Sequence, residues 1–460
     1  MLPIYTRYLT PADYGAVELL GMALEITGIL VGLRISQAMF RYYILENDNH
    51  QKKVIVSTVL LTVIIAGGFG SLLLYAGSNY LVYAIFGNLE YLTEFKLFAL
   101  TLVTNAISAA GLSYLRARQK PLFFVSVGIA SLAIQVMLNI YFVVHLELHV
   151  RGVVYSAMLS GAIVAVFLSM YVIHKTGFHY SREVLARLVR FIAPLIIASI
   201  GAFYVAYADK YFIRIFTSLA DVGIYSLAVR VSSVLSVAFE AFNMSWGADR
   251  FEIVKRENAR IIYEKVFRIL NMALILTGAG LSIFARDFFY IMTHPEFYPA
   301  GNIVPIMVMA SIVRIYTTYC NFGALYNEQT RIMAEASWSK AAVSTVFYLT
   351  LIPSAGIMGA ALAILFGNLI EFIWVHKKSS KLYNMGLDWK PVLIMLSVAL
   401  LCVVFGATMA EGSVISFAMR CTIFIVLAIA IWLLPFWKDG EKEMIISLIT
   451  RSKRSSGKIS

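Results

Sequence analysis

Thirteen apolar segments, separated by short polar connections, dominate the sequence. A helix that crosses a bilayer needs about 20 mostly apolar residues. The thirteen segments are 15–40, 54–76, 97–115, 122–144, 152–173, 188–211, 222–244, 267–292, 303–325, 341–353, 357–376, 391–409 and 417–436. The segment 341–353 is shorter than the others, and a turn at 353–356 separates it from 357–376. No connection is long enough to hold an inserted soluble domain. The sequence therefore predicts an all-α polytopic membrane protein.

The composition excludes a soluble multidomain protein. Apolar residues make up 60% of the 460 residues and charged residues 14%, against about 45–50% and about 25% in soluble proteins. The net charge of +12 is carried by basic residues in short runs between apolar segments. Membrane proteins distribute charge in this way, so membrane lipids and not nucleic acid are the expected partners.

Sequence signatures of enzymes and metal sites are missing. Cys320, Cys402 and Cys421 lie in apolar stretches without metal-ligand spacing, and the seven histidines form no HExxH-like pair. No nucleophile elbow or phosphate-binding loop is present. The sequence therefore predicts a protein that is not an enzyme and has no metal, no cofactor and no ATP-driven step.

The basic residues fall on alternate connections. One set of connections, together with the C-terminal tail, holds 28 Lys and Arg residues. The opposite set holds 7, which are Arg7, Lys96, Arg151, Lys210, Arg214, Arg286 and Arg420. Because basic loops stay on the cytoplasmic side, this bias predicts a multi-pass protein of the cytoplasmic (inner or plasma) membrane with a cytoplasmic C-terminus.

Three sequence matches at nearly constant spacing indicate an internal repeat. Residues 11–15 resemble 219–223, polar positions from Thr101 to Ser108 resemble those from Ser311 to Thr318, and residues 152–157 resemble 356–361. The charge count gives both copies the same orientation, which predicts parallel repeats.

The repeat sets the expected organisation of the chain. We expect an N-terminal lobe at 1–180, a C-terminal lobe at 181–380, an extra helix pair at 381–436 and a basic cytoplasmic tail at 437–460. The helix at 188–211 has almost no counterpart before residue 11. The repeat thus predicts a first helix that is largely missing here, and fourteen spans when it is present.

Six motifs are distributed over both halves of the chain. They are RYLTPADYG at 7–15, FRYY at 40–43, RFIAPL at 190–195, ADKYFI at 208–213, DVGIYSLA at 221–228 and GIMGAALA at 356–363. Together they resemble the polysaccharide transporter family of oligosaccharidyl-lipid flippases, which includes O-antigen flippases. This family belongs to the superfamily of multidrug, oligosaccharidyl-lipid and polysaccharide exporters. The resemblance implies a two-lobe helical bundle like that of multidrug and toxin extrusion (MATE) proteins, working by alternating access.

The resemblance also implies a function. The implied cargo is an undecaprenyl-pyrophosphate-linked oligosaccharide, moved across the cytoplasmic membrane for lipopolysaccharide or exopolysaccharide biosynthesis. The expected partners are this lipid-linked oligosaccharide, membrane lipids and other polysaccharide assembly proteins. An alternative is a MATE-like antiporter of small molecules. A membrane polysaccharide polymerase or acyltransferase fits less well, since no large outer loop or His/Asp constellation is present.

Polar residues inside the predicted spans are the candidates for binding cargo, because intramembrane charges are costly. Arg314, Thr318 and Asn321 lie on one face of their predicted helix. A guanidinium binds a pyrophosphate group through bidentate, charge-assisted hydrogen bonds. Each arginine also has a structural explanation: Arg314 pairs with a buried carboxylate, Arg230 pairs with Asp209 or Asp221, and Arg34 extends to the interface. The candidate substrate-binding residues are Arg314, Arg230, Arg34, Thr318, Asn321, Thr104 and Asn105.

Three acidic residues are candidates for proton or sodium coupling. Glu18 and Glu25 share one helix face with Gly21, Gly28 and Gly32, and Asp209 lies at the end of its span. The alternatives are an ion pair with a neighbouring arginine for Glu25 and helix-end anchoring for Asp209.

Overall fold

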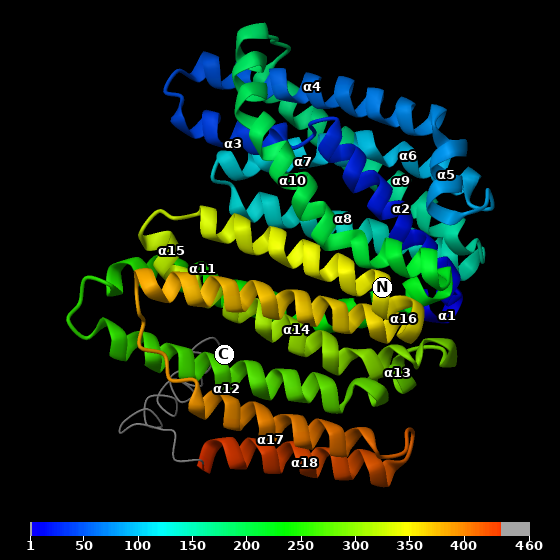
Figure 1. The fold of residues 1–460 in the computed structure, drawn as a ribbon. Coiled ribbons are helices and arrows are strands. Elements are labelled where there is room, and N and C mark those ends of the chain that lie inside the picture. Colours follow the sequence, from blue (N-terminus) through cyan, green and yellow to red (C-terminus); the bar gives the residue numbers. More distant parts are fainter. Residues whose placement is uncertain (1, 434–460) are drawn as a thin grey trace, which may run out of the picture. The chain divides into compact units, whose positions relative to one another are not determined.

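The computed structural model describes residues 2–433, and every regular element in this range is helical (Figure 1). The predicted basic tail at 437–460 lies outside the described residues. The helices are α1 (Leu2–Tyr8), α2 (Pro11–Leu30), α3 (Ile35–Leu45), α4 (Asn49–Ala76), α5 (Ser78–Phe86), α6 (Leu92–Ala99), α7 (Thr101–Ala117), α8 (Pro121–Asn139), η1 (Ile140–His145), α9 (His149–Thr176), α10 (Arg182–Phe216), α11 (Leu219–Ile253), α12 (Ala259–Ile283), α13 (Ala285–Met292), η2 (Pro295–Phe297), α14 (Ala300–Cys320), α15 (Phe322–Tyr326), α16 (Arg331–Leu382), α17 (Lys390–Ala407) and α18 (Val414–Leu433).

The first predicted span is divided into two helices. Thr10 begins α2 with a capping box, in which its hydroxyl accepts from the backbone N–H of Asp13 and its own N–H donates to the Asp13 carboxylate. The span bends by 49° between α2 and α3. Gly32 lies in this break with φ of +77°, a conformation that side chains with a Cβ rarely adopt. The predicted span at 15–40 is therefore broken into two helices, α2 and α3.

The long helix α16 reverses direction at Gly356. The backbone there is non-helical, with φ of 55° and ψ of −135°. Lys378 Nζ lies 2.7 Å from Glu335 Oε2, whereas 43 residues of straight helix would hold their ends about 65 Å apart. Only a hairpin brings these side chains together, so α16 consists of two antiparallel helices that meet at the predicted turn 353–356.

Length and composition make this a multi-pass membrane protein. Eleven helical segments of the described residues are long and apolar enough to cross a membrane, or twelve if the bent α2–α3 pair forms one span. The sequence predicts thirteen, and part of the difference arises because α16 is counted once although it reverses at Gly356. On α8, Leu122, Ile129 and Met137 are all more than half exposed. Such a surface suits lipid and not water.

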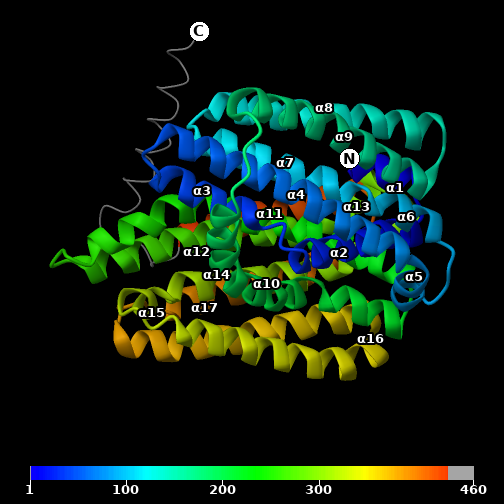
Figure 2. The ribbon, with the colours of Figure 1, turned by 90° about the horizontal axis from the view of Figure 1, so that it is seen from above.

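The described chain forms two compact units. Unit 1 comprises residues 1–230, 291–303 and 337–370. One of its cores joins α3, α4, α7, α9 and α10 around residues such as Val59, Tyr114 and Leu188. Figure 2 shows α7, α8 and α9 side by side, and Leu115, Val127 and Leu168 form a core between these three helices.

Among the described residues, unit 2 comprises 231–290, 304–336 and 371–433. In it, α17 and α18 lie side by side and pack on α12 (Figure 1). The core between them contains Ile275 of α12, Met395 of α17 and Leu427 of α18. The helices α17 and α18 fall within the segment predicted as an extra pair, 381–436. The division into two repeated lobes stays a prediction.

A fully buried arginine secures the loop between α17 and α18. Arg420 has no exposed surface. Its guanidinium forms an ion pair with Asp287 of α13 and donates to the backbone carbonyls of Gly406 and Met409. The sequence analysis placed Arg420 among the residues of the outer connections. The structure instead places it within α18, where it neutralises a buried carboxylate and satisfies loop carbonyls.

We expect Arg420→Lys to lower the free energy of unfolding by about 2 kcal/mol. A lysine keeps the charge beside Asp287 but lacks the planar fork that reaches several carbonyls, and each lost hydrogen bond is worth about 1 kcal/mol. Thermal unfolding of purified protein measures the change. Arg331→Lys is the matched control, because the Arg331 side chain is 90% exposed. Equal melting temperatures for both variants would contradict the assignment.

Candidate functional site

The helices α2 and α11 approach closely near their first turns. A Cβ built on Gly15 would lie 2.1 Å from the carbonyl oxygen of Leu219, and one built on Gly223 would lie 2.0 Å from that of Pro11. These four residues are matched positions of the predicted repeat, and the contact is reciprocal. Reciprocal contact is what two copies related by a two-fold axis would produce. Only glycine permits this approach.

Beyond the crossing, Glu18 of α2 holds two cations. Its Oε2 lies 2.6 Å from Lys210 Nζ of α10, and its Oε1 lies 2.7 Å from Arg230 Nη2 of α11. The Glu18 and Lys210 side chains are 14% and 11% exposed, whereas that of Arg230 is 50% exposed. The Arg230 guanidinium also lies over the Tyr14 ring, 5.6 Å from its centroid. The Lys210 side of this network is therefore buried, whereas the Arg230 side chain is half exposed.

The predicted partners of Arg230 are different from the one observed. Arg230 pairs with Glu18 in the structure, whereas the sequence analysis named Asp209 or Asp221. Asp209 is buried and accepts hydrogen bonds from the Tyr225 hydroxyl and from the backbone N–H of Lys210, each at 2.8 Å. Lys210 is the residue that the sequence did not place at this site. Lys210 directly follows an acidic residue at the end of an apolar segment, and this position is the sequence signal by which it could have been identified.

Glu25 and Arg34 form a second, more exposed ion pair. Arg34 Nη2 lies 2.9 Å from Glu25 Oε1, and their side chains are 46% exposed for Glu25 and 36% for Arg34. Arg34 reaches back to α2 from the break before α3. This is the neighbouring arginine that the sequence analysis offered as the structural explanation of Glu25.

Arg314 presents its side chain from α14 without a partner. The residue is exposed, and within residues 2–433 no hydrogen bond or ion pair to its guanidinium is found. The Thr318 hydroxyl donates to the Arg314 backbone carbonyl at 3.3 Å, which leaves the guanidinium available. The predicted alternative, a buried carboxylate paired with Arg314, has no counterpart in the part of the chain that the structure describes.

The Asn321 side chain accepts a hydrogen bond from Arg250, which lies beyond the predicted span 222–244. Arg250 Nη1 donates to Asn321 Oδ1 at 3.1 Å. Arg250 is only 8% exposed and lies near the rings of Phe251 and Phe322. The helix α11 extends to Ile253, and so Arg250 is a packed residue of its last turn.

The first-half candidates lie on α7. The Thr104 hydroxyl donates to the Thr101 carbonyl at 3.0 Å and faces Gly161 of α9. Asn105 is exposed, and its side chain has no hydrogen-bond partner among residues 2–433. Asn105 therefore offers a free amide, whereas Thr104 is engaged in helix packing.

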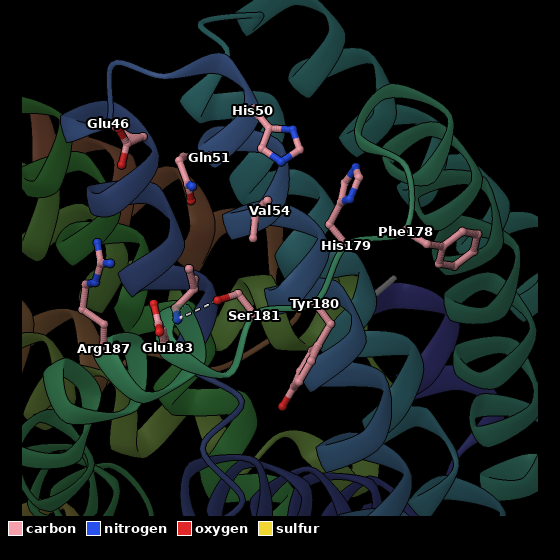
Figure 3. A pocket seen from close by; sticks show the side chains of 11 residues that line it. Glu46, His50, Gln51, Val54, Phe178, His179, Tyr180, Ser181, Glu183 and Arg187 are labelled. Atoms are coloured by element: carbon pink, nitrogen blue, oxygen red, sulfur yellow. Dashed lines mark hydrogen bonds between the residues drawn. The ribbon is translucent and has the colours of Figure 1, made fainter.

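Two basic connections meet at one end of unit 1 around a pocket of about 540 Å³ (Figure 3). Backbone N–H groups of His179 and Ser181 donate to Ser57 and Thr58 of α4, at 2.9 and 3.1 Å. The rings of His50 and His179 lie edge to face, with their centroids 5.3 Å apart. The sequence predicts both connections on the cytoplasmic side, and the structure places them together.

One carboxyl group near this pocket has a perturbed pKa. Asp48 caps α4 and accepts from the backbone N–H groups of His50 and Gln51, at 3.0 and 3.3 Å. These hydrogen bonds, with that from His50 the largest cause, lower the pKa of Asp48 below its usual value. The cap is therefore present at neutral pH and weakens only as the pH falls through this lowered pKa. Among residues 2–433, no group of three or more His, Cys, Asp or Glu side chains is arranged to hold a metal ion.

The described residues thus form a multi-pass helical membrane protein with charged residues inside its spans. Residues 4–288 match the sequence profile of the family described as polysaccharide biosynthesis protein. The chain belongs to this family, which confirms the predicted kinship with polysaccharide transporters. Comparison with curated protein sequences gave no significant match.

Solved structures show the same fold. The lipid II flippase MurJ in an inward closed conformation is similar with a TM-score of 0.72 and 12% identity, over 94% of each chain. A multidrug resistance MATE family transporter in an inward-facing conformation is similar with a TM-score of 0.65 and 15% identity, over 83% of this chain and 93% of the other. At such identities the similarity establishes a MATE- and MurJ-like fold, and the predicted fold class is confirmed at that level.

Proposed function

We propose that this protein is a flippase that moves an undecaprenyl-pyrophosphate-linked oligosaccharide across the cytoplasmic membrane by alternating access. The product would serve surface polysaccharide biosynthesis, such as that of lipopolysaccharide O-antigen or exopolysaccharide. Membership of the polysaccharide biosynthesis family and the MurJ-like fold support this proposal. The proposed orientation keeps the C-terminus in the cytoplasm, as the distribution of basic residues indicates.

The guanidinium of Arg314, which has no partner among residues 2–433, carries the proposal. Arg314 lies in the segment Pro295–Tyr326, which is apolar enough to cross a membrane. An unpaired charge at that depth is costly in lipid, so it must face water or a ligand. A pyrophosphate is the part of a lipid-linked oligosaccharide that a guanidinium binds best, through two charge-assisted hydrogen bonds.

Within unit 1, the Glu18 network is proposed as a separate cargo contact. One carboxylate there, that of Glu18, holds two cations, and the Asp209 carboxylate lies beside Lys210. Arg230 is the exposed member, and an incoming phosphate would compete with Glu18 for its guanidinium. Arg34, Thr318, Asn321, Thr104 and Asn105 remain proposed contacts of the oligosaccharide, with Asn105 the best placed because its amide is free.

Proton or sodium coupling is assigned to the acidic residues of α2 and α10. Glu25 is accessible and held by a single exposed arginine, so it can exchange its partner for an ion at low cost. Glu18 and Asp209 are bound by cations or hydroxyl groups in the interior, and their coupling role requires release of these partners.

The alternative function is a MATE-like antiporter of small molecules, which the fold similarity favours. The positive charge of Arg314 opposes a cationic drug, because like charges repel in a site with little water. Reconstituted vesicles separate the two functions. Translocation of a fluorescent lipid-linked oligosaccharide supports the flippase, whereas uptake of an organic cation without lipid translocation overturns it.

We expect Arg314→Ala to reduce surface polysaccharide at least tenfold in cells that depend on this protein, while the amount of membrane-inserted protein is unchanged. Loss of a charge-assisted contact to phosphate is worth about 1.5–3 kcal/mol. Quantitative staining of surface polysaccharide and immunoblotting of membranes measure the two quantities. Arg331→Ala, at an exposed site outside the cargo path, is the control. Full polysaccharide in the Arg314 variant would remove this residue from the cargo site.

A further inference from the structure

A second pocket at the basic end of unit 1 has no part in the proposed transport step. It has a volume of about 580 Å³ and is lined by Tyr42, Glu183, Ala186, Arg187, Arg190 and Phe191. Glu183 and Arg187 also line the pocket of Figure 3, so the two cavities adjoin at these side chains. All lining residues belong to α3 and the first turns of α10.

The pocket holds two arginines that pair with no acidic side chain among residues 2–433. Arg187 and Arg190 are exposed, and neither forms an ion pair within residues 2–433. Arg41 adds a third positive charge at the rim, with its guanidinium 5.3 Å from the centroid of the Tyr42 ring and 4.9 Å from that of Phe191. Glu183 is the one acidic side chain that lines this pocket.

An apolar stripe continues from the pocket along α10. Arg190, Ala193, Pro194 and Ile197 follow the spacing of one helix face, and each is exposed. The Ile197 side chain is 73% exposed. The pocket therefore lies where α10 changes from a basic first part to an apolar surface.

Two exposed aromatic residues lie close to the basic residues of this pocket. Phe178 and Tyr180, in the connection before α10, are 70% and 56% exposed and line the adjoining pocket. Exposed aromatic side chains next to basic residues are typical of the membrane–water interface. At the membrane–water interface, a cluster of cations would lie at the depth of the lipid phosphates.

We propose that this pocket binds the headgroup of an anionic phospholipid. Arg187 and Arg190 hold the phosphate, Arg41 and the rings of Tyr42 and Phe191 enclose the glycerol end, and an acyl chain follows the stripe toward Ile197. A protein or nucleic acid ligand would leave this stripe uncovered. A zwitterionic lipid would leave the positive charge of the pocket uncompensated.

The test uses full-length protein in phosphatidylcholine nanodiscs with graded amounts of phosphatidylglycerol. Each arginine near an anionic headgroup contributes about fivefold in affinity, so Arg187→Gln with Arg190→Gln is expected to weaken phosphatidylglycerol binding about 25-fold. Arg182→Gln is the matched control. It lies on the same helix and lines neither pocket, and we expect less than a twofold effect.

A photoactivatable phosphatidylglycerol locates the lipid on the unaltered protein, so the result does not depend on folding of the variant. Labelled peptides are expected from 40–45 and 183–197. Labelling elsewhere, or equal loss of binding in the Arg182 variant, overturns the proposal. Displacement of the probe by undecaprenyl pyrophosphate but not by unlabelled phosphatidylglycerol also overturns it, because the site would then belong to the cargo.

Discussion

Alanine at Gly15 or at Gly223 is expected to prevent accumulation of folded protein. A Cβ at either position would lie about 2 Å from a backbone carbonyl oxygen of the facing helix, and a backbone cannot move aside as a side chain can. The helices would have to separate, and their shared packing would be lost. We expect a loss of at least about 3 kcal/mol in the free energy of unfolding for each variant. Size-exclusion profiles and thermal unfolding in detergent measure the outcome.

Gly21 provides the matched control on the same helix. A Cβ there would meet no atom within 4 Å, and alanine within a helix is about 1 kcal/mol more favourable than glycine. Gly21→Ala is therefore expected to keep or raise the melting temperature. If Gly15→Ala behaves like Gly21→Ala, α2 and α11 do not cross at Gly15. The double variant at Gly15 and Gly223 is expected to cost less than the sum of the two, because one separation of the helices relieves both clashes.

The sequence predicted the features that depend on local patterns. Apolar length located most of the membrane-crossing helices, and the reversal at Gly356 follows from a Pro and Gly turn. The match between 11–15 and 219–223 pointed to the segments that meet at Gly15 and Gly223, although not to the contact itself. Each of these signals is contained in a few adjacent residues.

The sequence could not predict features that depend on how helices are rotated against each other. Arg230 pairs with Glu18, which is 212 residues away, and no local pattern distinguishes Glu18 from Asp209 as its partner. Arg420 was assigned to an outer connection because it lies near the start of an apolar segment, yet α18 turns it inward to Asp287. The bend after Leu30 also escaped prediction, because glycines inside apolar helices are common in membrane proteins.

The ion pairs of Glu18 lead to a prediction about stability that could not be made from the positions of the helices in the sequence. Glu18→Gln is expected to lower the free energy of unfolding by about 3 kcal/mol, because Lys210 would remain in the interior without the carboxylate that pairs with it. Lys210→Met leaves Glu18 its second partner, Arg230, and is expected to cost less. Thermal unfolding of the two single variants and of the double variant measures the coupling between the residues.

The double variant decides whether the ion pair or the helix packing matters. With both charges removed, no uncompensated buried cation remains, and we expect most of the loss in Glu18→Gln to be recovered. Additive losses would contradict the pairing. Glu25→Gln, two turns further along α2, is the control for stability, because its ion pair with Arg34 is exposed and is worth less than about 1 kcal/mol. The same variant tests function, since a coupling role for Glu25 requires that transport lose its dependence on the ion gradient while the melting temperature stays unchanged.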